Sequence, residues 1–130
     1  MQTKTTTIEK QSTDLIDLVL ENDYFRRVVE TGKHEQVVVM TLQVGEDIGE
    51  EVHPTIDQVF IFVDGEGEAV LDGKSRSFDE GDLVFVRAGT RHNIINRGET
   101  PLKLITIYAP PAHEAGTIHK TKAEAAHEEH

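Results

Sequence analysis

The chain has 130 residues, no cysteine, a formal net charge of −11 and 37% hydrophobic residues. This length fits one domain, and the absence of cysteine excludes disulfides and thiolate metal sites. The acidic balance argues against nucleic acid and anionic membranes as partners, because phosphate groups attract basic surfaces. No apolar run reaches the roughly 20 residues of a membrane span. No charged-then-apolar leader opens the chain, so we expect a cytoplasmic protein.

The N-terminal part, residues 1–22, predicts an arm followed by a short helix. Residues 1–12 are rich in Thr, Lys and Gln, which is typical of a mobile arm or an edge-strand extension. Ser12 or Thr13 is a candidate cap for a helix over about 14–21, because their hydroxyls accept hydrogen bonds from the first turn.

The middle part, residues 23–109, is a series of short apolar runs separated by turns. We expect strands at 24–30, 35–44, 48–53, 58–63, 67–71, 74–78, 83–86, 91–97 and 102–109. Asp72-Gly73 between two alternating runs predicts a two-residue hairpin. Many short strands at this spacing predict an all-β sandwich or barrel. Because their edges need cover, we expect a homodimer in which the N-terminal arm crosses to the partner.

Two stretches carry the residues that suggest chemistry. The first runs Gly45, five residues, Glu51, one residue, His53, four residues, Gln58, six residues, Gly65. The second runs Gly81, five residues, Arg87, Ala88, Gly89, two residues, His92, three residues, Asn96. Both spacings resemble the two motifs of the cupin family. Three residue types depart from that pattern: Glu51 replaces a histidine, Gln58 a glutamate and Arg87 a proline.

The resemblance implies a cupin barrel, a jelly roll or double-stranded β-helix, with Glu51, His53, Gln58 and His92 around one divalent ion. Glu51 and His53 are two apart on a predicted strand, so their side chains share a face. With His92 they form a 2-His-1-carboxylate set, a ligand type that suits non-haem iron. The resemblance leaves Fe, Mn, Ni and Zn open as the ion.

Gln58 has two possible roles, as a weak fourth ligand or as a hydrogen-bond partner of a metal-bound water. A barrel that has lost its metal is the alternative reading of the whole site. Against it, a buried Glu51 without a cation carries a desolvation cost of several kcal/mol.

Phe60 and Phe62 lie on the same face as Gln58, so they are the predicted substrate-pocket residues. Core packing is the more common role for such residues, and for Phe85 and Ile94. We expect further roles outside the metal site: His34 and Glu50 on the surface, Arg87 solvated or meeting an anionic substrate, and Asn96 closing a turn.

Residues 110–130 predict a flexible C-terminal tail that contains His113 and His119. Thr121 can cap a short helix at 122–129, which has little apolar surface. The tail is either solvated or folded over the barrel mouth, where it would contribute a histidine. It resembles the tails of small bacterial cupins labelled mannose-6-phosphate isomerase-like.

These observations favour a metal-dependent enzyme with a small-molecule ligand. The resemblance implies a sugar-, uronate- or small-acid-like substrate and isomerisation or oxygenation as the reaction. The alternative is a non-catalytic barrel that binds or senses a small molecule.

Overall fold

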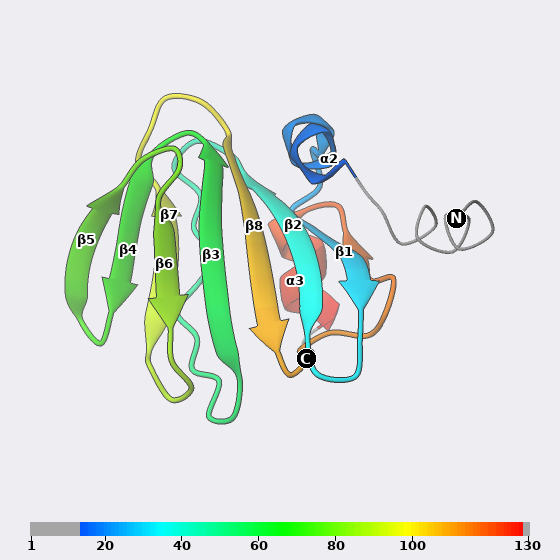
Figure 1. The fold of residues 1–130 in the computed structure, drawn as a ribbon. Helices are drawn as coiled ribbons and strands as arrows, with labels where there is room; N and C mark the ends of the chain where they lie inside the picture. Colours follow the sequence, from blue (N-terminus) through cyan, green and yellow to red (C-terminus); the bar gives the residue numbers. More distant parts are fainter. Residues whose placement is uncertain (1–13, 129–130) are drawn as a thin grey trace, which may run out of the picture.

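The computed structural model describes residues 14–128, which form two antiparallel β-sheets (Figure 1). The strand orders are β6-β3-β8-β2-β1-β9 and β5-β4-β7. Eight strands have bounds close to those expected: β1 (Arg26–Thr31), β2 (Gln36–Leu42), β3 (Asp57–Asp64), β4 (Gly67–Leu71), β5 (Lys74–Phe78), β6 (Leu83–Val86), β7 (His92–Asn96) and β8 (Leu102–Ala109). The all-β barrel predicted from the sequence is confirmed.

The core lies between the two sheets. Alternation along β3 buries Phe60 and Phe62 completely, and the Phe62 ring stacks on Phe78 of β5 with centroids 3.5 Å apart. Ala69 and Ile94 of the smaller sheet are also fully buried in this cluster. Each buried aromatic or aliphatic side chain contributes about 1.5–3 kcal/mol relative to exposure.

The β4–β5 hairpin forms as predicted at Asp72-Gly73. Asp72 has φ 49° and Gly73 has φ 82°, so both occupy the left-handed region. Two-residue hairpin loops of type I′ need this conformation at both central positions, and Asp-Gly adopts it at low cost.

The strand predicted at 48–53 does not form as a continuous strand. This stretch pairs with β7 through two isolated bridges, Asp47 with Ile95 and Glu51 with His92. Gly49 lies between them with φ 106°, a conformation outside the β region. The alternating pattern of this stretch therefore predicted more regular pairing than the backbone allows.

The helix α2 (Leu15–Glu21) packs against the outer face of the larger sheet, where Val19 is fully buried beside Val39 and Ile105. Its cap is Asp14, whose carboxylate accepts from the Asp17 N–H at 3.3 Å. The expected caps Ser12 and Thr13 and the predicted arm, residues 1–12, lie outside the described residues. None of the described helices is long and apolar enough to cross a membrane.

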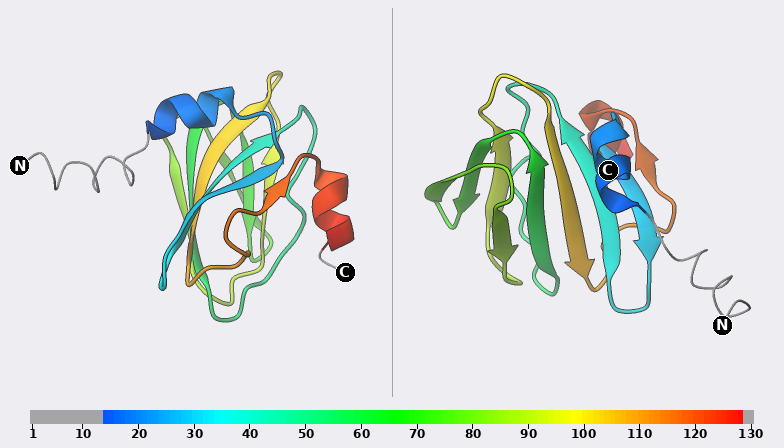
Figure 2. Two further views of the ribbon diagram at one scale, coloured as in Figure 1. Left: turned by 90° about the vertical axis from the view of Figure 1, so that its right-hand side faces the viewer. Right: turned by 45° about the horizontal axis from the view of Figure 1, so that its top comes forward.

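Residues 110–128 of the predicted C-terminal tail lie against the barrel, as in the alternative in which the tail folds over it. They form β9 (Ile118–His119), which pairs with β1, and α3 (Lys122–Glu128), which lies beside the barrel (Figure 2). The predicted cap of α3 is confirmed, since Thr121 Oγ1 accepts from the Glu124 N–H at 3.1 Å. Ala125 is 4% exposed and joins the core. The tail is ordered mainly by polar contacts, which hydrophobic patterning does not register.

Candidate metal centre

Three of the predicted ligands converge in the structure. Glu51 and His92 face each other across an isolated antiparallel bridge, with their backbone N–H groups donating to each other's carbonyl oxygens at 2.9 Å. His53 follows two residues later, and its Nε2 lies 3.4 Å from Glu51 Oε1. One ligand atom from each of the three residues lies within 4.8 Å of the others. Two imidazoles and one carboxylate thus meet at metal-site spacing.

Hydrogen bonding fixes the tautomer of His92. Its Nδ1 lies 2.9 Å from the backbone carbonyl oxygen of Thr90. A carbonyl oxygen only accepts, so Nδ1 carries the proton and Nε2 keeps its lone pair. This backbone carbonyl is the outer partner that commonly orients a metal-ligating histidine.

Three buried polar atoms near these residues make no hydrogen bond in the structure: His53 Nε2, His92 Nε2 and Gln58 Oε1. A buried acceptor without a partner costs about 1–3 kcal/mol. Imidazole nitrogens and amide oxygens both coordinate divalent cations, so these donor atoms fit a metal ion.

Gln58 is 2% exposed, and its Nε2 donates to Thr106 Oγ1 at 2.9 Å. The amide nitrogen of Gln58 is therefore engaged by Thr106, whereas the amide oxygen has no hydrogen-bond partner. This orientation suits either role predicted for Gln58. Its participation as the fourth member of the site stays a prediction.

Glu51 is ionised at neutral pH despite its burial. Burial by itself raises the pKa of this carboxyl, but the neighbouring His53, Arg26 and His92 outweigh it and hold the pKa below its ordinary value. Arg26 is 2% exposed on β1. Sequence reasoning missed it, although its alternation with the buried Val28 signals an inward-facing position.

A cavity of about 360 Å³ opens beside the candidate ligands. Its lining comes from two segments, the loop after the Glu51 bridge and the tail: Glu51, Val52, His53, Ile56, Ala112 and His113. Burial, with a smaller contribution from Arg26, lowers the pKa of His113 to about 4. The volume lies in the range of small-molecule pockets.

Phe60 and Phe62 do not line this cavity. Both are fully buried in the core, and the Phe60 ring centroid lies 6.2 Å from that of His92. Both rings therefore belong to the hydrophobic core, which was the alternative to lining the substrate pocket.

The burial of the remaining singled-out residues tests the roles expected for them. Asn96 is structural as expected, because its side chain bonds the carbonyl oxygens of Leu42 and Thr100 and the N–H of Gly98. Phe85 is not a core residue: it is 44% exposed, and the Arg87 guanidinium lies over its ring. His34, Glu50 and Arg87 are exposed.

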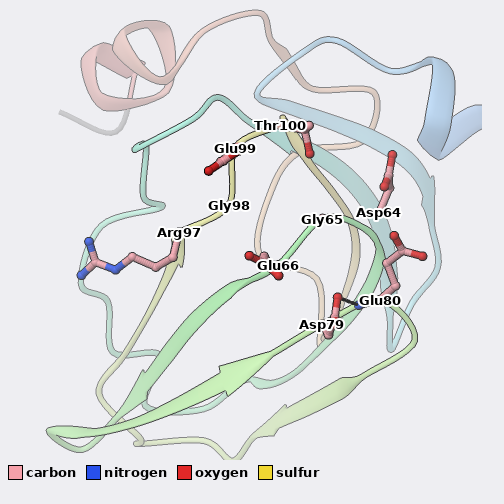
Figure 3. Close-up of a pocket in the computed structure, with 9 residues that line it drawn as sticks. All are labelled: Asp64, Gly65, Glu66, Asp79, Glu80, Arg97, Gly98, Glu99 and Thr100. Atoms are coloured by element: carbon pink, nitrogen blue, oxygen red, sulfur yellow. Dashed lines mark hydrogen bonds between the residues drawn. The ribbon is translucent and has the colours of Figure 1, made fainter.

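A second cavity, of about 340 Å³, lies among turns of the chain (Figure 3). Its lining is mostly acidic: Asp64, Gly65, Glu66, Asp79, Glu80, Arg97, Gly98, Glu99 and Thr100. None of the buried unsatisfied side-chain atoms in the described part of the chain belongs to it. The first cavity is therefore the candidate functional site.

The family model for the cupin domain matches residues 38–108. The chain belongs to the cupin family. A crystal structure of a Bacillus halodurans protein matches this cupin at 40% identity, with a TM-score of 0.88, covering 89% of this chain and 92% of that one.

Two curated relatives extend the comparison. The uncharacterized protein YrkC of Bacillus subtilis is 49% identical over 112 residues, which are 81% of this cupin and 60% of the relative. A mannose-1-phosphate guanylyltransferase of Salmonella montevideo is 28% identical over 79 residues, 61% of this cupin and 17% of the enzyme. The chain spans about three fifths of the length of the first curated relatives it matches.

Proposed function

We propose that this cupin is a metal-dependent enzyme that acts on a small polar molecule. The observation that carries the proposal is that one ligand atom from each of Glu51, His53 and His92 lies within 4.8 Å of the others, while Nε2 of both histidines is buried without a hydrogen-bond partner. Glu51 and His53 also line a cavity of about 360 Å³. Buried acceptors in this arrangement are costly unless a cation completes them.

The residues that would hold the ion are Glu51, His53 and His92, with Gln58 as the weaker fourth member. Fe, Mn, Ni and Zn all accept such donors. A bound divalent ion supplies Lewis acidity, or an O2-activating centre if it is redox-active. The Thr90 carbonyl keeps His92 in the ligating tautomer, and Thr106 keeps the Gln58 oxygen unengaged.

Sugar-, uronate- and small-acid-like molecules are the substrate classes that we propose, with isomerisation or oxygenation as the reaction. The cavity volume supports a small molecule. The isomerase-like part of the proposal is supported only by a distant relative, the guanylyltransferase, of which this cupin covers 17%.

A non-catalytic binding or sensor barrel is the second candidate. It is favoured by the composition of the cavity wall, where His113 is the one titratable group besides Glu51 and His53. Such a wall offers few groups for proton transfer.

Elemental analysis of protein purified without a chelating column tests the metal. Sugar phosphates, uronates and small diketones would then be screened with Fe(II), Mn(II), Ni(II) and Zn(II). The enzyme proposal predicts turnover that disappears on metal removal. Turnover that survives complete removal would contradict it, and silence across the screen with metal bound would favour the binding barrel.

A further inference from the structure

The cavity beside the metal centre is not complete without the C-terminal tail. Ala112 and His113 line it together with Glu51 and His53. Both tail residues lie beyond residue 108, where the match to the family model ends. This part of the cavity therefore lies outside the segment that the family model matches.

A buried glutamine fixes the backbone at His113. Gln36 on β2 is fully buried, and its Nε2 donates to the His113 carbonyl oxygen at 2.7 Å. Its Oε1 accepts from the N–H groups of Ala112 at 3.2 Å and His113 at 3.0 Å. One side chain thus uses both ends of its amide to hold the peptide at these two positions. The His113 ring lies edge-on to Tyr108, with centroids 5.1 Å apart.

The rest of the tail is anchored on the same side of the barrel. β9 pairs with β1, and His119 Nδ1 lies 3.1 Å from the Arg26 guanidinium. Lys122 on α3 reaches Asp47 at 2.5 Å. Hydrogen bonds from Lys122 and Asn93 lower the pKa of Asp47, so this anchor stays charged at neutral pH.

The charges around the site favour an anionic ligand. Arg26 and Glu51 line one small cavity of about 50 Å³ under α3, and their charges offset each other. A divalent ion bound to Glu51, His53 and His92 would therefore leave an excess of positive charge. An anionic oxygen donor offsets that charge more strongly than a neutral one.

We propose that the tail completes a binding site for a small carboxylate, with the carboxylate on the metal and His113 hydrogen-bonded to the same molecule. This inference rests on the metal function proposed above and selects one substrate class from it. His113 is then the specificity-determining residue, since its imidazole is the one side chain of the tail in the cavity that can form hydrogen bonds.

The experiment uses the full chain loaded with Co(II), with Co(II) content measured first. Glycolate is titrated against the visible absorption of the bound cobalt, and glycolamide serves as its neutral counterpart of equal size. We compare the wild type with His113→Ala, with His113→Gln, which keeps hydrogen-bonding capacity, and with the exposed control His34→Ala.

Glycolate should bind the wild type at least about 10-fold more tightly than glycolamide. His113→Ala should lose about 10-fold to 100-fold of the glycolate affinity, as expected for a hydrogen bond to a charged ligand. His113→Gln should recover part of it, and His34→Ala should match the wild type. Cobalt stoichiometry should be the same in all four proteins.

Equal affinity for glycolate and glycolamide, absence of glycolate binding, or unchanged affinity in His113→Ala would overturn the carboxylate site while leaving the metal function intact. Loss of cobalt from His113→Ala would make His113 a metal ligand and would also overturn it. Absence of cobalt from the wild type would instead overturn the metal function, and this inference with it.

Discussion

The two cavities of this cupin have nearly the same volume, about 360 and 340 Å³, yet different chemistry. The cavity at the candidate metal centre is lined by Glu51 and His53, and the buried Nε2 of His53 has no hydrogen-bond partner. The acidic cavity is bordered by carboxylates on turns, such as the exposed Asp79 and Glu80 (Figure 3). Solvated carboxylates are satisfied by water, whereas a buried polar atom needs a hydrogen-bond donor or a cation as its partner. Buried polar atoms without hydrogen-bond partners, rather than volume or charge, distinguish the candidate site from the acidic cavity.

Removing both imidazoles should have the largest effect. His53→Ala with His92→Ala should abolish metal binding, because only Glu51 and Gln58 would remain as candidate donors. Elemental analysis after equilibration with Zn(II) measures it. The matched control is Asp79→Ala with Glu80→Ala at the acidic cavity, which should keep full stoichiometry. Unchanged metal in the histidine pair, or loss in the control pair, would reverse the comparison.

Metal should also stabilise the fold through the first cavity alone. At a free metal concentration about 100 times the Kd, the free energy of unfolding should rise by about 2.7 kcal/mol. For a domain of this size the midpoint should rise by roughly 10 °C. Calorimetry of the metal-free and loaded wild type measures this shift. The double histidine variant should show none, while a shift of equal size there would place the stabilising ion elsewhere.

The charged candidate ligand should contribute more to metal affinity than the neutral one. Glu51→Ala should weaken metal affinity more than Gln58→Ala, because the carboxylate carries a formal charge and the amide oxygen does not. We expect about 10-fold for Gln58→Ala and about 100-fold for Glu51→Ala, a difference of about 1.4 kcal/mol. Competition titrations with a chelator give both values. The reverse order would show that Gln58 is the stronger donor.

The smallest effect is expected at the acidic cavity. Arg97 pairs with Glu68 at 3.1 Å, and the Arg97 side chain is 62% exposed. Solvent screens such a pair, so Arg97→Met should change the free energy of unfolding by less than about 1 kcal/mol. Chemical denaturation with and without added salt checks this. A loss of several kcal/mol would mean that this cavity is held by buried electrostatics after all.

Several expectations stay predictions: the homodimer, the small-molecule ligand and the identity of the metal. The dimer is open to a direct measurement, since light scattering at micromolar concentration distinguishes 14.5 kDa from twice that mass. The arm that would be exchanged, residues 1–12, lies outside the described residues.

The sequence by itself determined the fold class and the ligand types. Alternating β-branched runs with Gly-containing turns are local signals, so eight strands and the Asp72-Gly73 hairpin could be predicted. The motif spacing indicated Glu51, His53 and His92 because side chains two apart share a face and the two motifs resemble those of a known family.

Only the tertiary structure decided which residues surround the candidate ligands. The break at Gly49, the burial of Arg26 beside Glu51, and the exposure of Phe85 depend on contacts between distant segments. The tail is the clearest case: Gln36 lies 77 residues before His113 and holds the backbone of Ala112 and His113 through three hydrogen bonds. Polar contacts between distant residues leave no periodic trace in a sequence, so the sequence left open whether the tail is solvated or folds over the barrel, and only the folded chain decided between the two.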